Sequence, residues 1–433
     1  MLKKKVMSLA LVLFLLAGTV IVLDSQAHAF FGFGDDDDED KALTLWHTEF
    51  VTEWPGRADV IDYFEKNNDL NVKKDYGPAN YRDIAQKMAI QANTGDPDVV
   101  EGVLGQMFSY QKAELIMHLD KYFKDYEAKD TYLKNALDAL TVDGKLYGIP
   151  YNTNVRLLLY RKSIFEEHNL DVPKNWDELV QTAAKINKLE SNMQGFMFTT
   201  KSREVRAFQE FMSFYLQLNR NMFDVSDSGV ELVATEDQLA QVLNLYKDMF
   251  FEGGINLDER GADWKALDYG YTSGKYAMVT VGPWIWGHRN GNQDRAEILD
   301  DTGIAAVPVA KNGKPGTYME VKPIMINKYS DQPDKAWELL KTVTSKGMQT
   351  TIDSKRGVLS PRKDVMNSEA MDNWWLSGFA EHMDTGVALD PISWERQQNV
   401  IIKAIQRTIY KEESPEEAAD WLHGKLAEIA NTL

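Results

Sequence analysis

The chain has 433 residues, 44% of them hydrophobic, and a formal net charge of −18 at pH 7. This length predicts two lobes or domains, and the acidic balance argues against nucleic acid and anionic membrane surfaces as partners. The absence of cysteine excludes disulfides, thiolate catalysis, cysteine-ligated metals and the lipidated cysteine of a lipoprotein.

The N-terminus has the pattern of an export signal. Three lysines at positions 3–5 precede an apolar run over residues 6–23, and Ala27-His28-Ala29 forms a small-x-small cleavage site. We expect residues 1–29 to be removed and the protein to be periplasmic, with a retained membrane anchor as the alternative that the long apolar run leaves open. Residues 30–41 are predicted to be a flexible acidic leader. Its run of acids lacks the mid-loop glycine and distal glutamate of a calcium loop.

Strand and helix patterns alternate from Ala42 onward. This alternation predicts an α/β fold with a mixed, mostly parallel sheet flanked by helices. The expected strands are 43–46, 98–100, 157–160, 277–281, 304–308 and 324–327, and the expected helices are 57–67, 80–93, 177–189, 206–218, 236–251, 334–345 and 415–426.

The stretch from Asp143 to Glu178 indicates a passage between two lobes. A short strand stops at Pro150, a polar segment follows at 151–154, and an apolar strand then leads to a helix capped by Asn175 with Glu178 at its third position. Further proline-marked crossings near Pro308 and Pro361 predict two discontinuous lobes. We expect lobe 1 to comprise residues 42–150 and 308–358, and lobe 2 to comprise residues 151–307 and 359–433.

This block, together with Gly282-Pro-Trp-Ile-Trp286, resembles the family 1 solute-binding proteins of ABC importers, which include the maltodextrin-binding proteins. The resemblance extends over nearly all of residues 41–433. It implies a two-lobed periplasmic-binding-protein fold with a multi-crossing hinge that closes on a ligand between the lobes. It also implies a sugar ligand, permease subunits of the inner membrane as partners, a monomer and no cofactor.

Tryptophans near strand ends indicate the class of ligand, because indole faces pack against sugar C–H groups. Trp284 is predicted to stack on the ligand, and Trp286 is a second candidate. The resemblance adds stacking at Trp394, hydrogen bonding from the segment that contains Tyr151 and Asn154, and cleft-loop positions at His47, Thr48, Glu49 and Gln106.

The loop at Gly102-Val-Leu-Gly105 departs from the maltodextrin branch, which carries a tryptophan and charged residues there. Maltose itself is therefore not the expected ligand.

Two alternatives remain open at this level. Carboxylates and tryptophans also bind polyamines or other cations, and the pair Glu49 and Glu53 has the chemistry of a glycoside hydrolase. The chain lacks the common motifs of hydrolases, phosphate-binding loops and metalloproteases, and no two histidines lie three or four residues apart. We therefore expect no catalytic activity and no metal site on a helix.

Overall fold

The structure is a computed structural model that describes residues 42–48, 57–68, 71–78, 80–226, 229–389, 392 and 394–433. The export signal, the acidic leader and Glu49 lie outside the described residues. Residues 43–433 form one unit. Within the described part, no helix has the length and apolar character needed to cross a membrane.

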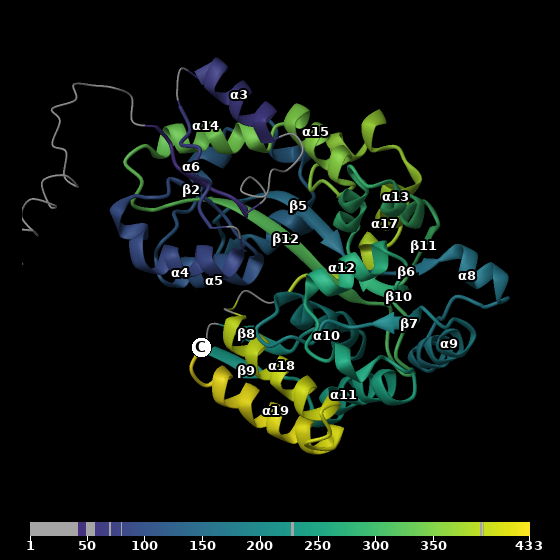
Figure 1. Cartoon of the computed structure of the whole chain (residues 1–433). Helices are drawn as coiled ribbons and strands as arrows, with labels where there is room; N and C mark the ends of the chain where they lie inside the picture. The colour runs from purple at the N-terminus through teal and green to yellow at the C-terminus, as the bar shows by residue number, and fades with distance from the viewer. Residues whose placement is uncertain are drawn as a thin grey trace, which may run out of the picture. The chain divides into compact units, whose positions relative to one another are not determined.

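One five-stranded sheet contains β1 (Leu45–Trp46), β2 (Val99–Glu101), β12 (Thr317–Ile326), β13 (Gly386–Val387) and β5 (Ile149–Val155). The pairs β1–β2 and β12–β13 are parallel, whereas β12 runs antiparallel to β2 and β5. In Figure 1 its long strand β12 lies among the helices of this part of the chain. Those helices are α3 (Arg57–Asn68), α4 (Tyr81–Gln91), α5 (Leu104–Lys112), α6 (Asp120–Phe123), α7 (Lys134–Ala139), α14 (Pro333–Val343), α15 (Lys346–Arg356) and α16 (Lys363–Met366).

A second sheet has the strand order β11-β6-β10-β7. Its strands are β6 (Leu157–Arg161), β7 (Gln194–Met197), β10 (Tyr276–Val281) and β11 (Thr302–Ala305). Only the β10–β7 pair is parallel, so both sheets are mixed but contain fewer parallel pairs than expected. The helices that follow these strands are α8 (Lys162–Glu167), α9 (Trp176–Leu189), α10 (Val205–Leu218), α11 (Glu236–Phe251), α12 (Trp264–Thr272), α13 (Gln293–Asp300), α17 (Trp374–Ala380), α18 (Glu395–Ile409) and α19 (Pro415–Ala430).

Two hairpins complete the strands, β3 (Thr141–Val142) with β4 (Lys145–Leu146) and β8 (Phe223–Ser226) with β9 (Gly229–Leu232). The helices α18 and α19 pack against α11, on the side of the second sheet (Figure 1). The helices thus divide mainly between the two sheets, as in the predicted two-lobed fold, although α10 packs against β12 of the first sheet.

Local sequence signals explain where several helices begin. Asn175 caps α9 by accepting a hydrogen bond from the backbone N–H of Glu178 at 2.9 Å, and its side-chain amide donates to the Glu178 carboxylate at 2.7 Å. Ser414 and Glu417 form a capping box at the start of α19, where Pro415 occupies the first turn. Both starts agree with the sequence prediction.

The prediction that a strand stops at Pro150 is wrong. β5 continues through this proline to Val155, so the change of sheet occurs at Arg156, before β6 begins. Pro150 is tolerated because it faces Pro323 at a register shift between Lys322 and Pro323, and a bulge leaves no regular ladder hydrogen bond to lose. The second change of sheet lies between β11 and β12, near the predicted crossing at Pro308. The full division into lobe segments stays a prediction.

Candidate functional site

The Gly282-Pro283-Trp284 turn begins where β10 ends. A Cβ atom at position 282 would lie 1.8 Å from the Trp284 ring, so only glycine allows the indole to fold back over the chain at this point. Trp284 is half-buried, and its Nε1 donates a hydrogen bond to Asp268 Oδ2 at 3.2 Å. The turn therefore holds one indole in a defined orientation.

Two arginines lie against the Trp284 ring. The guanidinium carbons of Arg156 and Arg206 are 4.8 and 4.6 Å from the ring centroid, within the range of cation–π attraction. Arg206 also forms an ion pair with Asp268 at 2.9 Å, and His288 Nε2 lies 3.4 Å from the same carboxylate. Burial would raise the pKa of Asp268, but Arg206 and His288 outweigh burial and lower it. The negative charge of the Asp268 carboxylate is therefore balanced by the neighbouring Arg206.

Arg156 connects the two sheets. It lies between β5 and β6, is 2% exposed, and donates hydrogen bonds to the side-chain oxygens of Asn154 and Gln209. Gln209 on α10 in turn donates to Glu320 Oε2 on β12 at 2.9 Å. Burial lowers the pKa of Arg156 to about 10, which still leaves it charged at neutral pH. A continuous polar network thus runs from the second lobe to the first sheet.

Glu101 at the end of β2 is the centre of a second buried network. Its carboxylate accepts hydrogen bonds from the Thr48 N–H at 2.7 Å and the Thr48 hydroxyl at 2.9 Å, and His47 Nδ1 lies 3.0 Å away. The hydroxyls of Tyr81 and Tyr151 also donate to it. Burial would raise the pKa of Glu101, but His47, Lys322 and the hydrogen bond from Tyr151 lower it far below its ordinary value. The carboxylate is thereby held ionised.

Six of the candidate residues from the sequence lie in or beside these two networks. His47, Thr48 and Tyr151 surround Glu101, whereas Asn154 belongs with Trp284 to the network of Arg156. Gln106 on α5 donates to the Tyr81 carbonyl at 2.6 Å, beside the Glu101 network.

The other two tryptophans lie in aromatic clusters of their own. Trp394 is 5% exposed, with its ring 5.5 Å from Phe208 and 6.0 Å from Phe223. Trp286 packs against Trp375 at 4.9 Å and Trp374 at 5.6 Å. In this structure protein side chains occupy positions around both rings, and their ligand roles stay predictions.

Sequence reasoning missed several charged and amide side chains of the networks. Arg206, Gln209 and Asp268 lie inside amphipathic helices, where polar residues usually face solvent, so the pattern gave no signal. Arg156 did have a signal in the sequence, because it is the only charged residue between two apolar strands in the hinge block. Glu101 could have been found as an acid that follows a buried strand directly.

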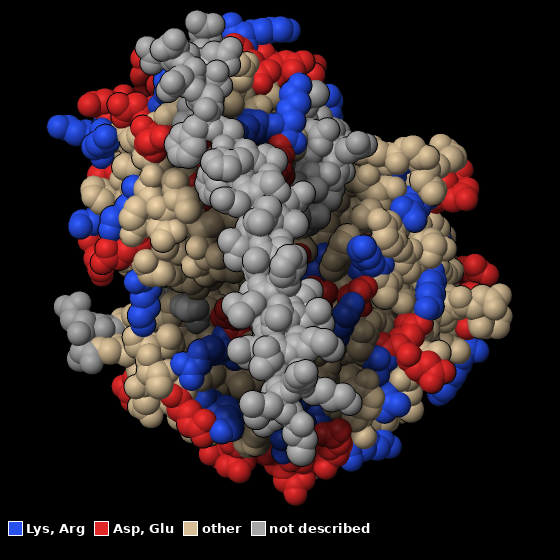
Figure 2. All heavy atoms as spheres, turned by 60° about the vertical axis from the view of Figure 1, so that its left-hand side comes forward, with Lys and Arg blue, Asp and Glu red and all other residues tan. Residues whose placement is uncertain are grey.

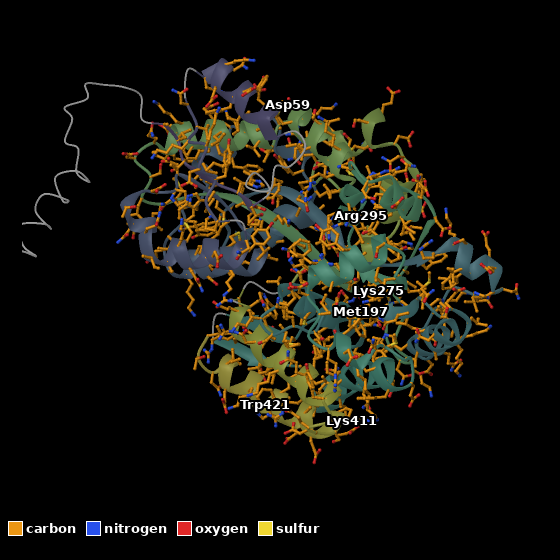
Figure 3. The ribbon with its side chains drawn as sticks, viewed as in Figure 1. Asp59, Met197, Lys275, Arg295, Lys411 and Trp421 are labelled. Atoms are coloured by element: carbon orange, nitrogen blue, oxygen red, sulfur yellow. The ribbon has the colours of Figure 1, made fainter. Side chains whose placement is uncertain are left out.

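A surface cavity of about 540 Å³ lies elsewhere on the second lobe. Its lining comes from the segment 258–262, from α12 and from neighbouring residues that include Lys275, Tyr276 and Arg295, two of which Figure 3 labels. None of the residues predicted to bind ligand lines it. Because every lining residue belongs to one lobe, this cavity does not have the two-sided construction expected of the predicted site.

Charges of both signs are interspersed on the face seen in Figure 2. The negative net charge of the chain is therefore not gathered into one visible acidic patch on this face.

Comparison with known proteins places this geometry in a family. The model of the bacterial extracellular solute-binding proteins matches residues 59–378, which include the second sheet, the strands β2, β5 and β12 of the first, the change of sheet at Arg156 and the Gly-Pro-Trp turn. The chain is a bacterial extracellular solute-binding protein. This agrees with the resemblance seen in the sequence.

Relatives of this solute-binding protein include transporter components. An ABC transporter extracellular-binding protein from Pyrococcus horikoshii is 25% identical over 358 residues, covering 77% of this chain and 76% of the relative. The galactooligosaccharide-binding protein of Bacillus subtilis is 25% identical over 346 residues, with 76% of each chain covered.

Solved structures confirm the two-lobed fold. Maltose-bound MalE3 of T. maritima superposes with a TM-score of 0.77 at 18% identity, covering 90% of this chain and 99% of that one. A solute-binding protein from Thermotoga lettingae bound with α-D-tagatose has a TM-score of 0.77 at 21% identity, covering 90% of this chain and 100% of that one.

Proposed function

We propose that this solute-binding protein binds a sugar or oligosaccharide between its two lobes and delivers it to an ABC importer without chemical change. The observation that carries the proposal is the position of Trp284, a half-buried indole in a network that draws residues from both lobes. An indole supplies the flat apolar face, and the surrounding amides and charged groups supply the hydrogen-bond partners, that a sugar needs. The oligosaccharide-binding relative in Bacillus subtilis supports the same ligand class.

The arrangement around Trp284 favours a sugar over the polyamine alternative. A cationic ligand would have to approach an indole that Arg156 and Arg206 already contact, and like charges would repel it. The carboxylate of Asp268 is paired with Arg206, and Glu101 is surrounded by donors. Both carboxylates therefore already have partners within the protein, and neither offers a free negative charge to a cationic ligand.

The cellular role follows from the same proposal. A cleaved signal at residues 1–29 would place the mature monomer in the periplasm, where its closed form would meet permease subunits in the inner membrane. N-terminal sequencing of the exported protein should then begin at Phe30, whereas an intact Met1 would support the retained anchor.

A ligand screen with a tryptophan substitution tests the proposal. The mature protein, residues 30–433, is heated with mono- and oligosaccharides and with polyamines, and a ligand at 100 times its dissociation constant should stabilise it by about 2.7 kcal/mol. Trp284→Ala should weaken binding of the sugar that responds by about 1–4 kcal/mol, measured by calorimetry, because a buried aromatic contact is lost.

Trp264→Ala is the matched control, because Trp264 is a 38% exposed tryptophan of the same lobe that does not line the network. It should leave the dissociation constant unchanged. If polyamines stabilise the protein and sugars do not, the proposed class of ligand is wrong. If Trp284→Ala binds the sugar with unchanged affinity, Trp284 is not part of the site.

A further inference from the structure

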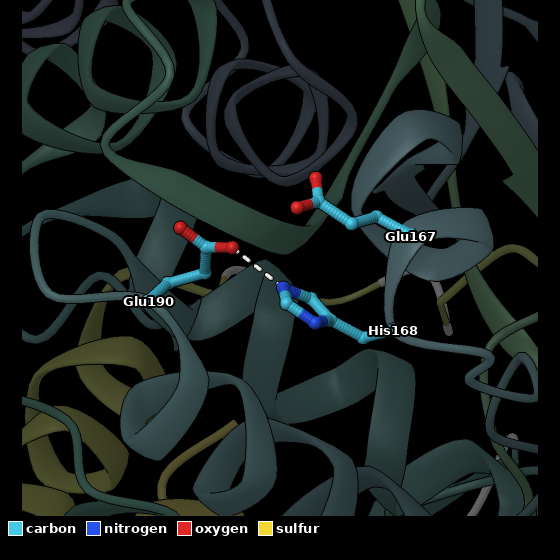
Figure 4. A group of neighbouring side chains, drawn as sticks. All are labelled: Glu167, His168 and Glu190. Carbon is cyan, nitrogen blue, oxygen red and sulfur yellow. Dashed lines mark hydrogen bonds and ion pairs between the residues drawn. The ribbon is translucent and has the colours of Figure 1, made fainter.

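Three side chains with metal-binding atoms converge on the second lobe, where α8 and α9 end. They are Glu167, His168 and Glu190, and one potential ligand atom from each lies within 4.8 Å of the others. His168 Nε2 is 2.6 Å from Glu190 Oε1, and the Glu167 carboxylate approaches from the adjacent position on α8 (Figure 4). The side chains of His168 and Glu190 are 17% and 27% exposed, so the group is partly shielded and still open to solvent.

The backbone holds these residues at the ends of two helices. His168 is the C-cap of α8, and its N–H donates to the Ile164 carbonyl at 3.2 Å. Glu190 is the C-cap of α9, and its N–H donates to the Ile186 carbonyl at 2.8 Å. Both ends are therefore fixed by helical hydrogen bonds, and the positions of the ligand-bearing Cα atoms do not depend on a free loop.

The electrostatics of this group favour a cation. The C-terminus of a helix carries partial negative charge, so carboxylates placed there are destabilised unless a positive charge is close. Among the described residues, no lysine or arginine forms an ion pair with Glu167 or Glu190. His168 is the one cationic partner that the described part of the chain offers to Glu190, and only when it is protonated.

The donor set indicates which cation would bind. One imidazole nitrogen and two carboxylate oxygens suit Zn²⁺ and related divalent transition metals, whereas Ca²⁺ and Mg²⁺ prefer oxygen alone. At Zn–ligand distances of about 2.0–2.2 Å, tetrahedral ligand atoms lie roughly 3.3–3.5 Å apart. His168 and Glu190 would separate slightly, and the exposed Glu167 side chain would swing inward to complete the set.

We propose that Glu167, His168 and Glu190 form a binding site for a divalent transition metal of the Zn²⁺ type, with water in the remaining position. The metal clamps the end of α8 to the end of α9. It lies apart from the Trp284 network, so this site does not depend on the proposed sugar-binding function. The sequence pattern does not predict this metal site, because Glu190 lies far from His168 in the sequence and only the tertiary structure brings the two together.

Calorimetric titration of tag-free mature protein with ZnCl₂ tests the site. The unmodified protein should bind one Zn²⁺ at this group, and Co²⁺ should give the visible absorption of a nitrogen- and oxygen-ligated site. His168→Ala, Glu190→Gln and Glu167→Gln should each weaken Zn²⁺ binding by at least about tenfold, the size found even for substitutions one shell further from a metal.

His118→Ala is the matched control. His118 Nδ1 lies 2.8 Å from Asp120, with both side chains about half exposed, and no third metal-binding side chain joins this pair among the described residues. This variant should bind Zn²⁺ as the unmodified protein does. The circular dichroism spectrum of the metal-free protein should be the same in every variant, which would show that the substitutions of Glu167, His168 and Glu190 leave the fold intact.

The result that overturns the proposal is Zn²⁺ binding that is equal in His168→Ala and the unmodified protein, or absent from both. Loss of binding in His168→Ala with no loss in Glu167→Gln and Glu190→Gln would also overturn the three-ligand site, because it would leave a single histidine as the ligand.

Discussion

Glu210 on α10 is fully buried beside Arg206, and one of its carboxylate oxygens accepts hydrogen bonds from the backbone N–H and the hydroxyl of Thr199, both at 2.8 Å. The other oxygen, Oε1, has no hydrogen-bond partner within the described part of the chain. Burial raises the pKa of Glu210 to about 8, against the smaller opposing effects of Arg206 and Thr199. The folded protein therefore keeps a proton that an unfolded chain gives up near pH 4.5.

This difference makes stability depend on pH. Between pH 4.5 and about 8 the folded state binds more protons than the unfolded state, so the contribution of Glu210 to stability falls as the pH rises through this window. Glu210→Gln keeps the neutral side chain and removes the titration. The variant should gain stability relative to the unmodified protein between pH 6 and pH 8, by at most about 1.4 kcal/mol per pH unit.

Urea unfolding at pH 6, 7 and 8 measures this gain. Thr199→Val serves as a control, because it removes a hydroxyl donor to Glu210 but keeps the Glu210 carboxyl group. The stability of this variant should therefore still change with pH. If the difference in the free energy of unfolding between Glu210→Gln and the unmodified protein is the same at all three pH values, Glu210 is ionised in the folded state.

At the scale of elements, α17 connects two loops around the candidate site. The indole N–H of Trp375 is shared between the carbonyls of Pro283 and Gly357, each at 3.1 Å, and the residue is fully buried. Pro283 belongs to the turn that orients Trp284, and Gly357 follows α15 with a left-handed φ of 66°. A Cβ at position 357 would also meet the Trp286 ring, so glycine is needed there for two reasons. One buried tryptophan thus ties the turn to the end of a helix.

Trp375→Phe should lower the free energy of unfolding by about 1–3 kcal/mol, because an aromatic ring remains but two buried carbonyls lose their donor. Chemical denaturation measures the loss. Trp421→Phe is the control, since the half-buried Trp421 of α19, labelled in Figure 3, donates no hydrogen bond from its indole to a described residue. Equal losses in the two variants would mean that ring volume, and not the shared hydrogen bond, holds α17 in place.

At the scale of the whole molecule, the chain changes sheet at Arg156 and again between β11 and β12. Connections of this kind allow hinge closure, and a ligand that contacts both lobes would shift the population toward the closed form. The radius of gyration of the mature protein, measured by small-angle X-ray scattering, should therefore decrease when the sugar identified by the thermal screen is added. An unchanged radius at saturating sugar would contradict closure while leaving binding itself intact.

The sequence alone determined the features that depend on neighbouring residues. The helix predicted over 236–251 is found at Glu236–Phe251, and the cap formed by Asn175 and Glu178 starts α9, because periodicity and capping act within one or two turns of chain. The family was also accessible from the hinge block and the Gly-Pro-Trp turn, which are continuous segments.

Only the tertiary structure decided how distant residues meet. Pro150 sits inside β5 because the pairing with β12 shifts register beside it, where β5 has one extra residue, and Arg156 reaches Gln209, which in turn reaches Glu320 across the change of sheet. Glu190 joins His168 from another helix in the same way. Buried polar groups must find partners wherever packing places them, and packing is set by the whole fold and not by local sequence.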